Sequence, residues 1–184
     1  MPYDEFQHRE FQNLTAHIST GRGLRDLGAF QSSELFILSA IALWCDHYRG
    51  VACRRAMVRN GFYAVGLAET DYAAFSCALE TVVASAKRPL VLPEKDLTAP
   101  TQDQTWLLEC FALAQHQKSP EAASLLAVLL PPAAVAITLE ALKDLGRSLT
   151  GTGLYLRMRS VINRPGLSIA GFGKAVKQKM SLAN

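Results

Sequence analysis

The sequence of 184 residues is 49% hydrophobic and 19% charged, and it holds 12 glycines and 8 prolines. A chain of this length and composition is expected to form one compact domain with its own core, which excludes disordered, collagen-like and low-complexity proteins. The formal net charge of +3 conceals a strong segregation of charge along the chain.

The first half of the chain predicts two helices at the start. Apolar residues recur with the period of a helix, and no alternating stretch is long enough to predict a sheet. We expect a helix over about 4–19 and another over 33–48, which would begin after a capping Ser32. The second is apolar on two faces, so it should lie at the centre of a bundle.

Two more helices and a connector follow. A short basic helix over about 51–59 is expected to end at Asn60 and Gly61, which tolerate left-handed backbone angles. The next helix should begin at a capping Thr70. It is followed by a proline-containing connector over 89–100, which is expected to be extended.

The second half contains three clear start signals. Thr101 and Gln104 have the spacing of a capping box for a helix that runs to about residue 117. The run Ser119-Pro120-Glu121 predicts the start of a short helix, and another should follow Pro131-Pro132 and end at Gly146. Weaker patterns suggest helices over about 154–163 and 168–181.

These elements predict an all-α protein, a single compact bundle of six to eight helices with a basic C-terminal extension. We divide it into a helical core domain over 1–146 and an extension over 147–184 that packs on the core or continues it. The apolar run over 35–45 is too short to cross a bilayer. The run over 122–142 is interrupted by two prolines, so two buried helices explain it better than one membrane span.

Cysteine usage and the N-terminus predict a cytoplasmic protein. The four cysteines, Cys45, Cys53, Cys77 and Cys110, lie in expected helices, and no two have the spacing of a C-x-x-C pair. Acidic residues stand near the start, where a signal peptide would need a basic region, so we expect no export.

Charge is the most informative feature of the sequence. Residues 1–48 and 60–146 sum to −3 and −5, whereas 49–59 and 147–184 sum to +4 and +7. The basic blocks supply the candidate partner-binding residues, namely Arg49, Arg54, Arg55, Arg59, Arg157, Arg159, Arg164, Lys174, Lys177 and Lys179. A stretch of 38 residues without an acid fits an anionic partner.

Several uses of the basic blocks remain open at this point. The tail could pack on the acidic body, with no external partner. It could bind nucleic acid, although Tyr155 and Phe172 are its only aromatic platforms. The amphipathic stretch over 168–180 could also contact a membrane surface or a partner's groove.

No motif predicts a catalytic, cofactor or metal site. The four histidines lack metal-ligand spacing, and Cys45 and His47 would point to opposite sides of one helix. The three G-x-G pairs lack the third glycine of a dinucleotide loop, and no nucleophile motif is present. Two carboxylate pairs, Glu69 with Asp71 and Glu94 with Asp96, lie at segment ends, where such residues usually interact with solvent or helix dipoles.

The function expected from these features is that of a non-enzymatic interaction or regulatory protein of the adaptor type. It would engage a protein partner through helical faces and its basic C-terminal tail. One alternative is a nucleic-acid-associated protein that uses the blocks 49–59 and 147–184. Another is an enzyme whose pocket forms only by tertiary contacts, near His47 or His116. Association into a homodimer is left open, and no cofactor is expected.

Overall fold

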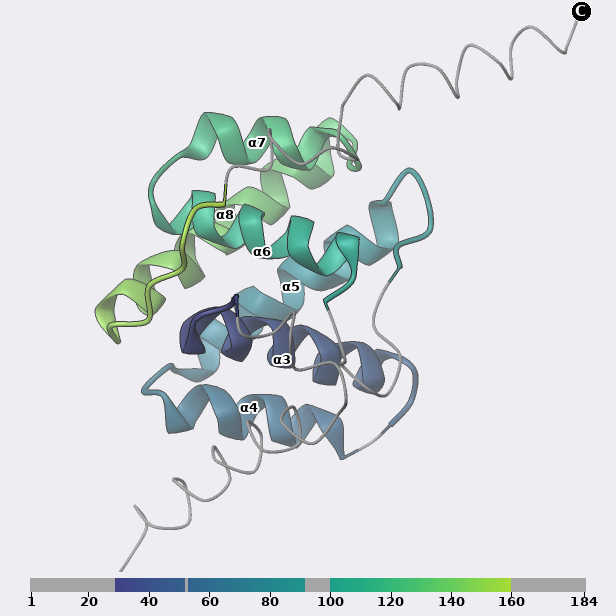
Figure 1. The fold of residues 1–184 in the computed structure, drawn as a ribbon. Helices are drawn as coiled ribbons and strands as arrows, with labels where there is room; N and C mark the ends of the chain where they lie inside the picture. Colours follow the sequence, from purple (N-terminus) through teal and green to yellow (C-terminus); the bar gives the residue numbers. More distant parts are fainter. Residues whose placement is uncertain (1–28, 52, 92–99, 160–184) are drawn as a thin grey trace, which may run out of the picture.

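A computed structural model describes residues 29–51, 53–91 and 100–159. Within these ranges the chain forms six helices and no strand, so the expected all-α bundle is confirmed (Figure 1). The helices are α3 (Ser32–Tyr48), α4 (Arg54–Ala64), α5 (Glu69–Ser85), α6 (Gln102–Gln115), α7 (Ser119–Ala127) and α8 (Pro132–Gly151). The helices expected over 4–19 and 168–181 lie outside the described residues, as does most of the basic extension.

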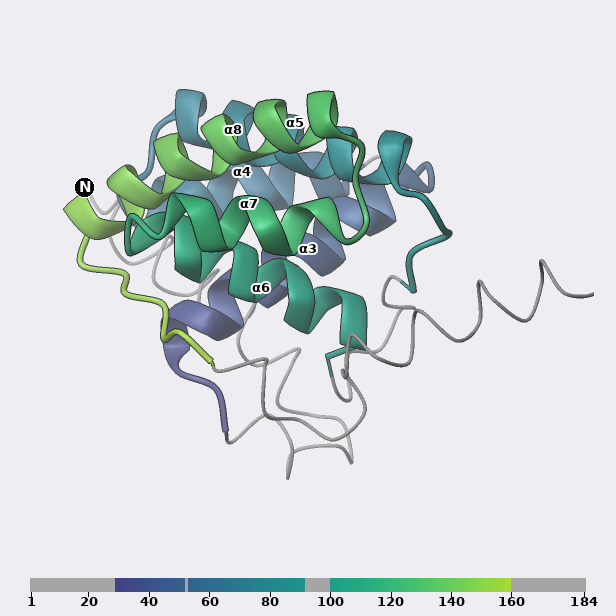
Figure 2. The same cartoon turned by 90° about the horizontal axis from the view of Figure 1, so that it is seen from above.

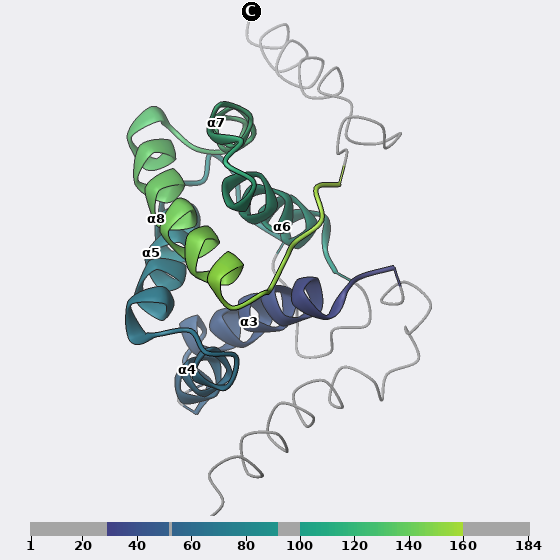
Figure 3. The same ribbon diagram turned by 90° about the vertical axis from the view of Figure 1, so that its left-hand side faces the viewer.

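The six helices pack around a shared core. Helices α5 and α8 run side by side over most of their length, and α6 packs on α8 (Figures 1 and 2). Helix α7 lies against both α6 and α8, whereas α3 contacts α6 on one side and α4 on the other. Figure 3 shows the chain leaving the end of α8 and running past α3 and α6.

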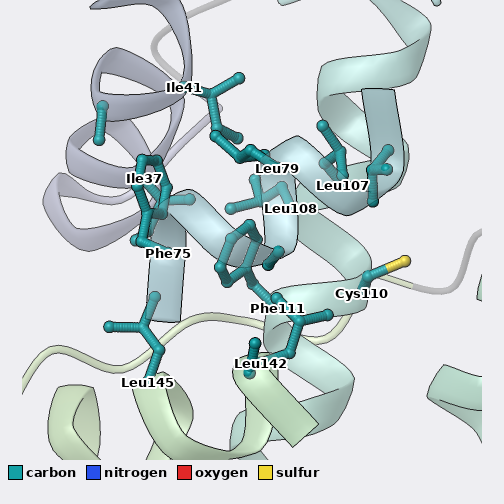
Figure 4. Packing of buried hydrophobic residues seen from close by; sticks show 14 of the residues in the cluster. Ile37, Ile41, Phe75, Leu79, Leu107, Leu108, Cys110, Phe111, Leu142 and Leu145 are labelled. Carbon is teal, nitrogen blue, oxygen red and sulfur yellow. The ribbon is translucent and has the colours of Figure 1, made fainter. Parts of the chain in front are cut away.

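The core is centred on α6. Side chains from four helices meet there, including Ile37 of α3, Phe75 of α5, Phe111 of α6 and Leu142 of α8 (Figure 4). The ring centroids of Phe75 and Phe111 lie 5.9 Å apart. Eleven of the fourteen residues of α6 are buried, because α3, α7 and α8 surround it. Helix α3 is buried on two faces as expected, but α6 is the more enclosed of the two.

The predicted capping box at the start of α6 is confirmed. The N–H of Gln104 donates to the Thr101 hydroxyl at 3.1 Å, and the N–H of Thr101 donates to the Gln104 side-chain carbonyl at 2.9 Å. The two hydrogen bonds satisfy two main-chain donors that a helix start otherwise leaves without partners.

The caps of α3 and α5 differ from the predicted hydroxyl caps at Ser32 and Thr70. In both helices a carboxylate in the first turn accepts the N–H of the residue three positions earlier: Glu34 from Gln31 at 2.6 Å, and Asp71 from Ala68 at 2.7 Å. Helix α3 therefore begins at Ser32, one residue earlier than expected, and α5 begins at Glu69, two residues earlier than a cap at Thr70 would place it. A carboxylate at this position also interacts favourably with the positive end of the helix dipole.

The predicted end of the basic helix is wrong. Helix α4 continues through Asn60 and Gly61 as far as Ala64. Its two buried residues, Val58 and Phe62, are four positions apart on one helical face, so packing against α3 and α5 holds the helix together across the Asn-Gly pair. Tertiary contact has overridden local propensity here.

The predicted end of the last long helix is also wrong. Helix α8 passes through Gly146 and ends at Gly151, so residues 147–151 belong to the same helix as the segment before them. A side chain at Gly146 would place its Cβ 2.8 Å from Gln115 Cα of α6. The glycine therefore serves close packing of α8 on α6 rather than helix termination.

Residues 154–159 form no helix, contrary to the pattern expected over about 154–163. Gly153 has φ of +77°, a conformation that ends α8 and favours glycine. The residues after it run along α3 and α6, where side chains bind their main-chain groups. Those distant partners replace the hydrogen bonds of a helix.

An ion pair joins the start of the connector to the first turn of α6. Arg88 donates two hydrogen bonds to the buried carboxylate of Asp103, and the Val91 N–H donates a third at 2.6 Å. The Thr101 hydroxyl donates to the Val91 carbonyl at 2.7 Å. Burial would raise the pKa of Asp103, but the hydrogen bonds from Arg88 and Val91 outweigh burial and lower it. The two described ends of the connector therefore lie together.

The fold accounts for the apolar stretches of the described sequence. None of the described helices is both long enough and apolar enough to cross a bilayer. Trp44 is 2% exposed, and its indole N–H donates to Ser76 of α5 at 2.8 Å. The apolar face of α3 that includes Trp44 therefore belongs to the core and is not a binding surface.

Candidate functional site

The first basic block divides into two arginine pairs, each around one acid. Arg49 and Arg54 lie 3.7 and 3.5 Å from the carboxylate of Asp46, at the end of α3. On the other flank of α4, Arg59 donates to Glu69 at 2.9 Å, and the charge of Arg55 also acts on Glu69. The block therefore does not form one continuous basic face.

Glu69, Arg59 and Tyr63 form an exposed polar cluster. The hydroxyl of Tyr63 donates to the same carboxylate as Arg59, and these two hydrogen bonds lower the pKa of Glu69. Glu69 is therefore ionised and partnered, and the nearby Asp71 caps α5. This arrangement explains the first carboxylate pair structurally, while Glu94 and Asp96 lie outside the described residues.

The described part of the second basic block binds one buried acid. Glu34 is 0% exposed, and its carboxylate accepts hydrogen bonds from both Arg157 and Arg159. The contacts are 2.9 Å from Arg157 Nη2, and 3.0 and 2.9 Å from Arg159 Nε and Nη2. Both guanidinium groups also donate to the Ala29 carbonyl, and that of Arg159 lies 3.9 Å from the centroid of the Phe30 ring.

The charge of Glu34 is maintained in spite of its burial. Burial alone would raise the pKa of this carboxyl group, but the hydrogen bonds from Arg159 and Arg157 outweigh burial. The N–H of Gln31 adds a further hydrogen bond, and the net pKa lies below its ordinary value. Glu34 is therefore ionised at neutral pH and holds two arginines 123 and 125 positions away in the chain.

Side chains of α3 and α6 bind the main chain between these arginines and the end of α8. Ser33 donates to the Tyr155 carbonyl at 2.5 Å. The Gln115 amide donates to the Leu154 carbonyl at 2.6 Å and accepts from the Leu156 N–H at 2.8 Å. His116 Nε2 donates to the Leu156 carbonyl at 2.8 Å. We call Ser33, Glu34, Glu109, Gln115 and His116 the segment site, because together they bind residues 154–159.

Glu109 completes the segment site beside Glu34. Its carboxylate accepts the Arg159 N–H at 2.8 Å, and the residue is 6% exposed. Burial raises the pKa of Glu109, and the neighbouring charge of Glu34 adds to the increase against the opposing effect of Arg159. The two acids of the site therefore have pKa values shifted in opposite directions, because only Glu34 receives guanidinium hydrogen bonds.

Sequence reasoning did not find Glu34 or its partners. Glu109, Gln115 and His116 were also missed as a group. The available signal was weak: Glu109 is the one polar residue other than Cys110 in the apolar run 106–114, Gln115 and His116 stand at the end of the helix, and each of the three could equally have faced solvent. Arg164, Lys174, Lys177 and Lys179 lie outside the described residues.

The described arginines of the two basic blocks lie on separate acids. Asp46, which pairs with Arg49 and Arg54 of the first block, is twelve residues after Glu34, which pairs with Arg157 and Arg159 of the second. Twelve helical residues span about 18 Å. The described arginines are thus distributed between separate sites rather than assembled into one basic surface.

No metal site was found among the described residues, where no three His, Cys, Asp or Glu side chains are grouped to hold an ion. Cys45 and Cys110 are buried, and burial raises the pKa of both thiols, that of Cys45 to about 12. Neither is a reactive nucleophile at neutral pH, because the thiolate is the reactive form.

Cysteine labelling gives a direct test of this arrangement. We expect a maleimide to modify Cys53 and Cys77, which are exposed, in the native protein at neutral pH. Cys45 and Cys110 should react only after unfolding, because they are buried and protonated. Peptide mapping by mass spectrometry identifies the labelled thiols, and denatured protein with all four labelled is the control. Rapid native labelling of Cys110 would contradict the packing of α6.

The chain matches no protein-family model, no curated protein and no solved structure in the comparisons made.

Proposed function

We propose that this protein is a non-enzymatic adaptor that presents a basic C-terminal tail, residues 160–184, to an acidic surface of a protein partner. The observation that carries the proposal is the fixed position of Arg159 on Glu34 and Glu109. The chain enters the tail from a defined point beside the start of α3, so the helical domain sets where the tail begins.

Charge separates the tail from the segment before it. Arg157 and Arg159 are paired with Glu34, whereas residues 160–184 contain four basic side chains and no acidic one. The tail therefore provides no carboxylate of its own to neutralise them. An acidic partner surface would supply the missing negative charge and guide association. The four free thiols support a cytoplasmic setting for this interaction.

A protein partner is preferred to nucleic acid because of the placement of the arginines. Proteins that bind a nucleic-acid backbone through sequence-independent contacts align many cations along one path. Here the paired arginines of the two blocks are divided among Asp46, Glu69 and Glu34, and each of these carboxylates would repel phosphate.

The test compares two full-length variants that lose the same charge. The tail variant is Lys174→Gln, Lys177→Gln and Lys179→Gln, and its matched control is Lys118→Gln, Lys143→Gln and Arg147→Gln, which changes three exposed cations of the helical domain. Each protein is used to capture partners from lysate at low and moderate salt, with and without nuclease treatment. We expect the tail variant to lose, by about tenfold, a protein that the control retains. Equal capture by both variants would refute the proposal, and nuclease-sensitive capture would favour nucleic acid.

A further inference from the structure

Residues 154–159 are held in the manner of a bound extended peptide. Side chains of the segment site bind the carbonyls of Leu154, Tyr155 and Leu156 and the N–H groups of Leu156 and Arg159. Domains that recognise peptides from other chains likewise bind main-chain groups for affinity and side chains for specificity. The main-chain contacts place no restriction on the side chains at these positions.

Specificity comes from three positions of the segment. Leu156 is 1% exposed, and Arg157 and Arg159 share the carboxylate of Glu34. Tyr155 and Met158 point outward, with exposures of 57% and 49%. The segment site is therefore complementary to the pattern Leu-Arg-x-Arg, with one buried apolar anchor and two cations on one buried acid.

The segment lies outside the helices and buries little apolar surface. It follows Gly153, whose φ of +77° makes residues 152–153 a turn rather than part of α8. Leu156 is the only fully buried side chain among residues 154–159. Segments with few buried apolar contacts open at lower free energy than the core around them.

We propose that the segment site is a peptide-binding site for extended Leu-Arg-x-Arg sequences, which residues 154–159 occupy as an internal competitor. A ligand of this pattern would displace the segment and so release the start of the tail. Such a ligand can come from a partner protein or from a second copy of this chain. The inference concerns the folded domain and does not rest on the tail proposal.

The test uses a fluorescently labelled peptide with the sequence of residues 153–160 and three full-length proteins. In Arg157→Gln with Arg159→Gln, the internal segment is weakened while the segment site is intact. We expect the peptide to bind this double variant at least about tenfold more tightly than the natural chain, in which the internal segment competes. Addition of Glu34→Gln should abolish the gain, because the site then lacks its carboxylate.

A peptide with both arginines replaced by glutamine is the matched ligand control and should not bind. Absence of binding to the folded double variant, or equal binding to all three proteins, would overturn the proposal. Light scattering of the natural chain mixed with the double variant separates the sources: a heterodimer identifies a second copy as ligand, and peptide binding without one identifies a partner segment.

Native-state hydrogen exchange tests the same proposal without any substitution. The N–H groups of Leu156 and Arg159 should exchange by local opening, well before those of Leu108 and Phe111 in the centre of α6. If the N–H groups of the segment were protected as strongly as those of α6, the segment would open only with the whole domain, and the inference would fail.

Discussion

Replacing Glu34 by glutamine is expected to lower the free energy of unfolding by about 3 kcal/mol at neutral pH. The substitution preserves the shape of the side chain but leaves Arg157 and Arg159 without their anionic partner. The expected loss lies at the lower end of the range for buried ion pairs, because the Arg157 side chain is 48% exposed and can be rehydrated. Chemical denaturation of the two proteins measures the difference.

The effect of Glu34→Gln should depend on pH in a defined direction. The pKa of Glu34 lies below its ordinary value of 4.5, so its contribution is fully present above that pH. As the pH falls through the lowered pKa, the carboxylate is protonated in the natural protein too, and the difference between the two proteins should shrink. A difference that stays constant down to the acid limit would contradict the ion-pair explanation.

Glu109→Gln is the matched control within the same cluster. The pKa of Glu109 is raised, so the fold favours its neutral form, and the charged form lowers stability as the pH rises through that pKa. An amide keeps an acceptor for the Arg159 N–H and removes the buried charge. We therefore expect this variant to be as stable as the natural protein at neutral pH or more so. A loss equal to that of Glu34→Gln would show that the charge of Glu109 also stabilises the fold, contrary to this expectation.

Gly146→Ala is expected to destabilise the protein by about 2 kcal/mol, although alanine is the better helix former. The new Cβ would lie 2.8 Å from Gln115 Cα and 3.0 Å from Gln115 N, which are main-chain atoms of α6 and cannot rotate away. An overpacking cost of about 3 kcal/mol is then offset by about 1 kcal/mol of helix propensity. Thermal and denaturant unfolding provide the measurement.

Gly151→Ala is the matched control for this prediction. Gly151 is in the same helix, and a Cβ there would meet nothing within 4 Å. Its replacement should leave stability unchanged or raise it slightly through helix propensity. If Gly146→Ala were as stable as this control, α6 and α8 would not approach as closely as described.

Gln115 links this packing to the segment site. Gln115 supplies main-chain atoms to the contact with Gly146 and an amide side chain to Leu154 and Leu156. We therefore expect Gly146→Ala also to speed hydrogen exchange at the Leu156 N–H. The close approach of α8 to α6 thus positions a residue that binds the segment after α8.

Local sequence determined the features that depend on near neighbours. The helical period predicted an all-α bundle, and the Thr101 to Gln104 spacing predicted the start of α6, because each depends on residues within a few positions. The proline at the second position of α7 is a signal of the same kind. Amphipathic spacing similarly predicted that α3 would be buried on two faces.

Tertiary structure decided where helices end and which charges meet. Asn60 and Gly61 would end an isolated helix, but the burial of Val58 and Phe62 carries α4 past them. Gly146 resembled a helix end, yet it is required by the main chain of α6. The pairing of Glu34 with arginines more than 120 positions away depends on how α3, α6 and the end of α8 pack. Sequence spacing carries no information about that distance, because a buried charge is stabilised by whatever opposite charge the fold brings to it.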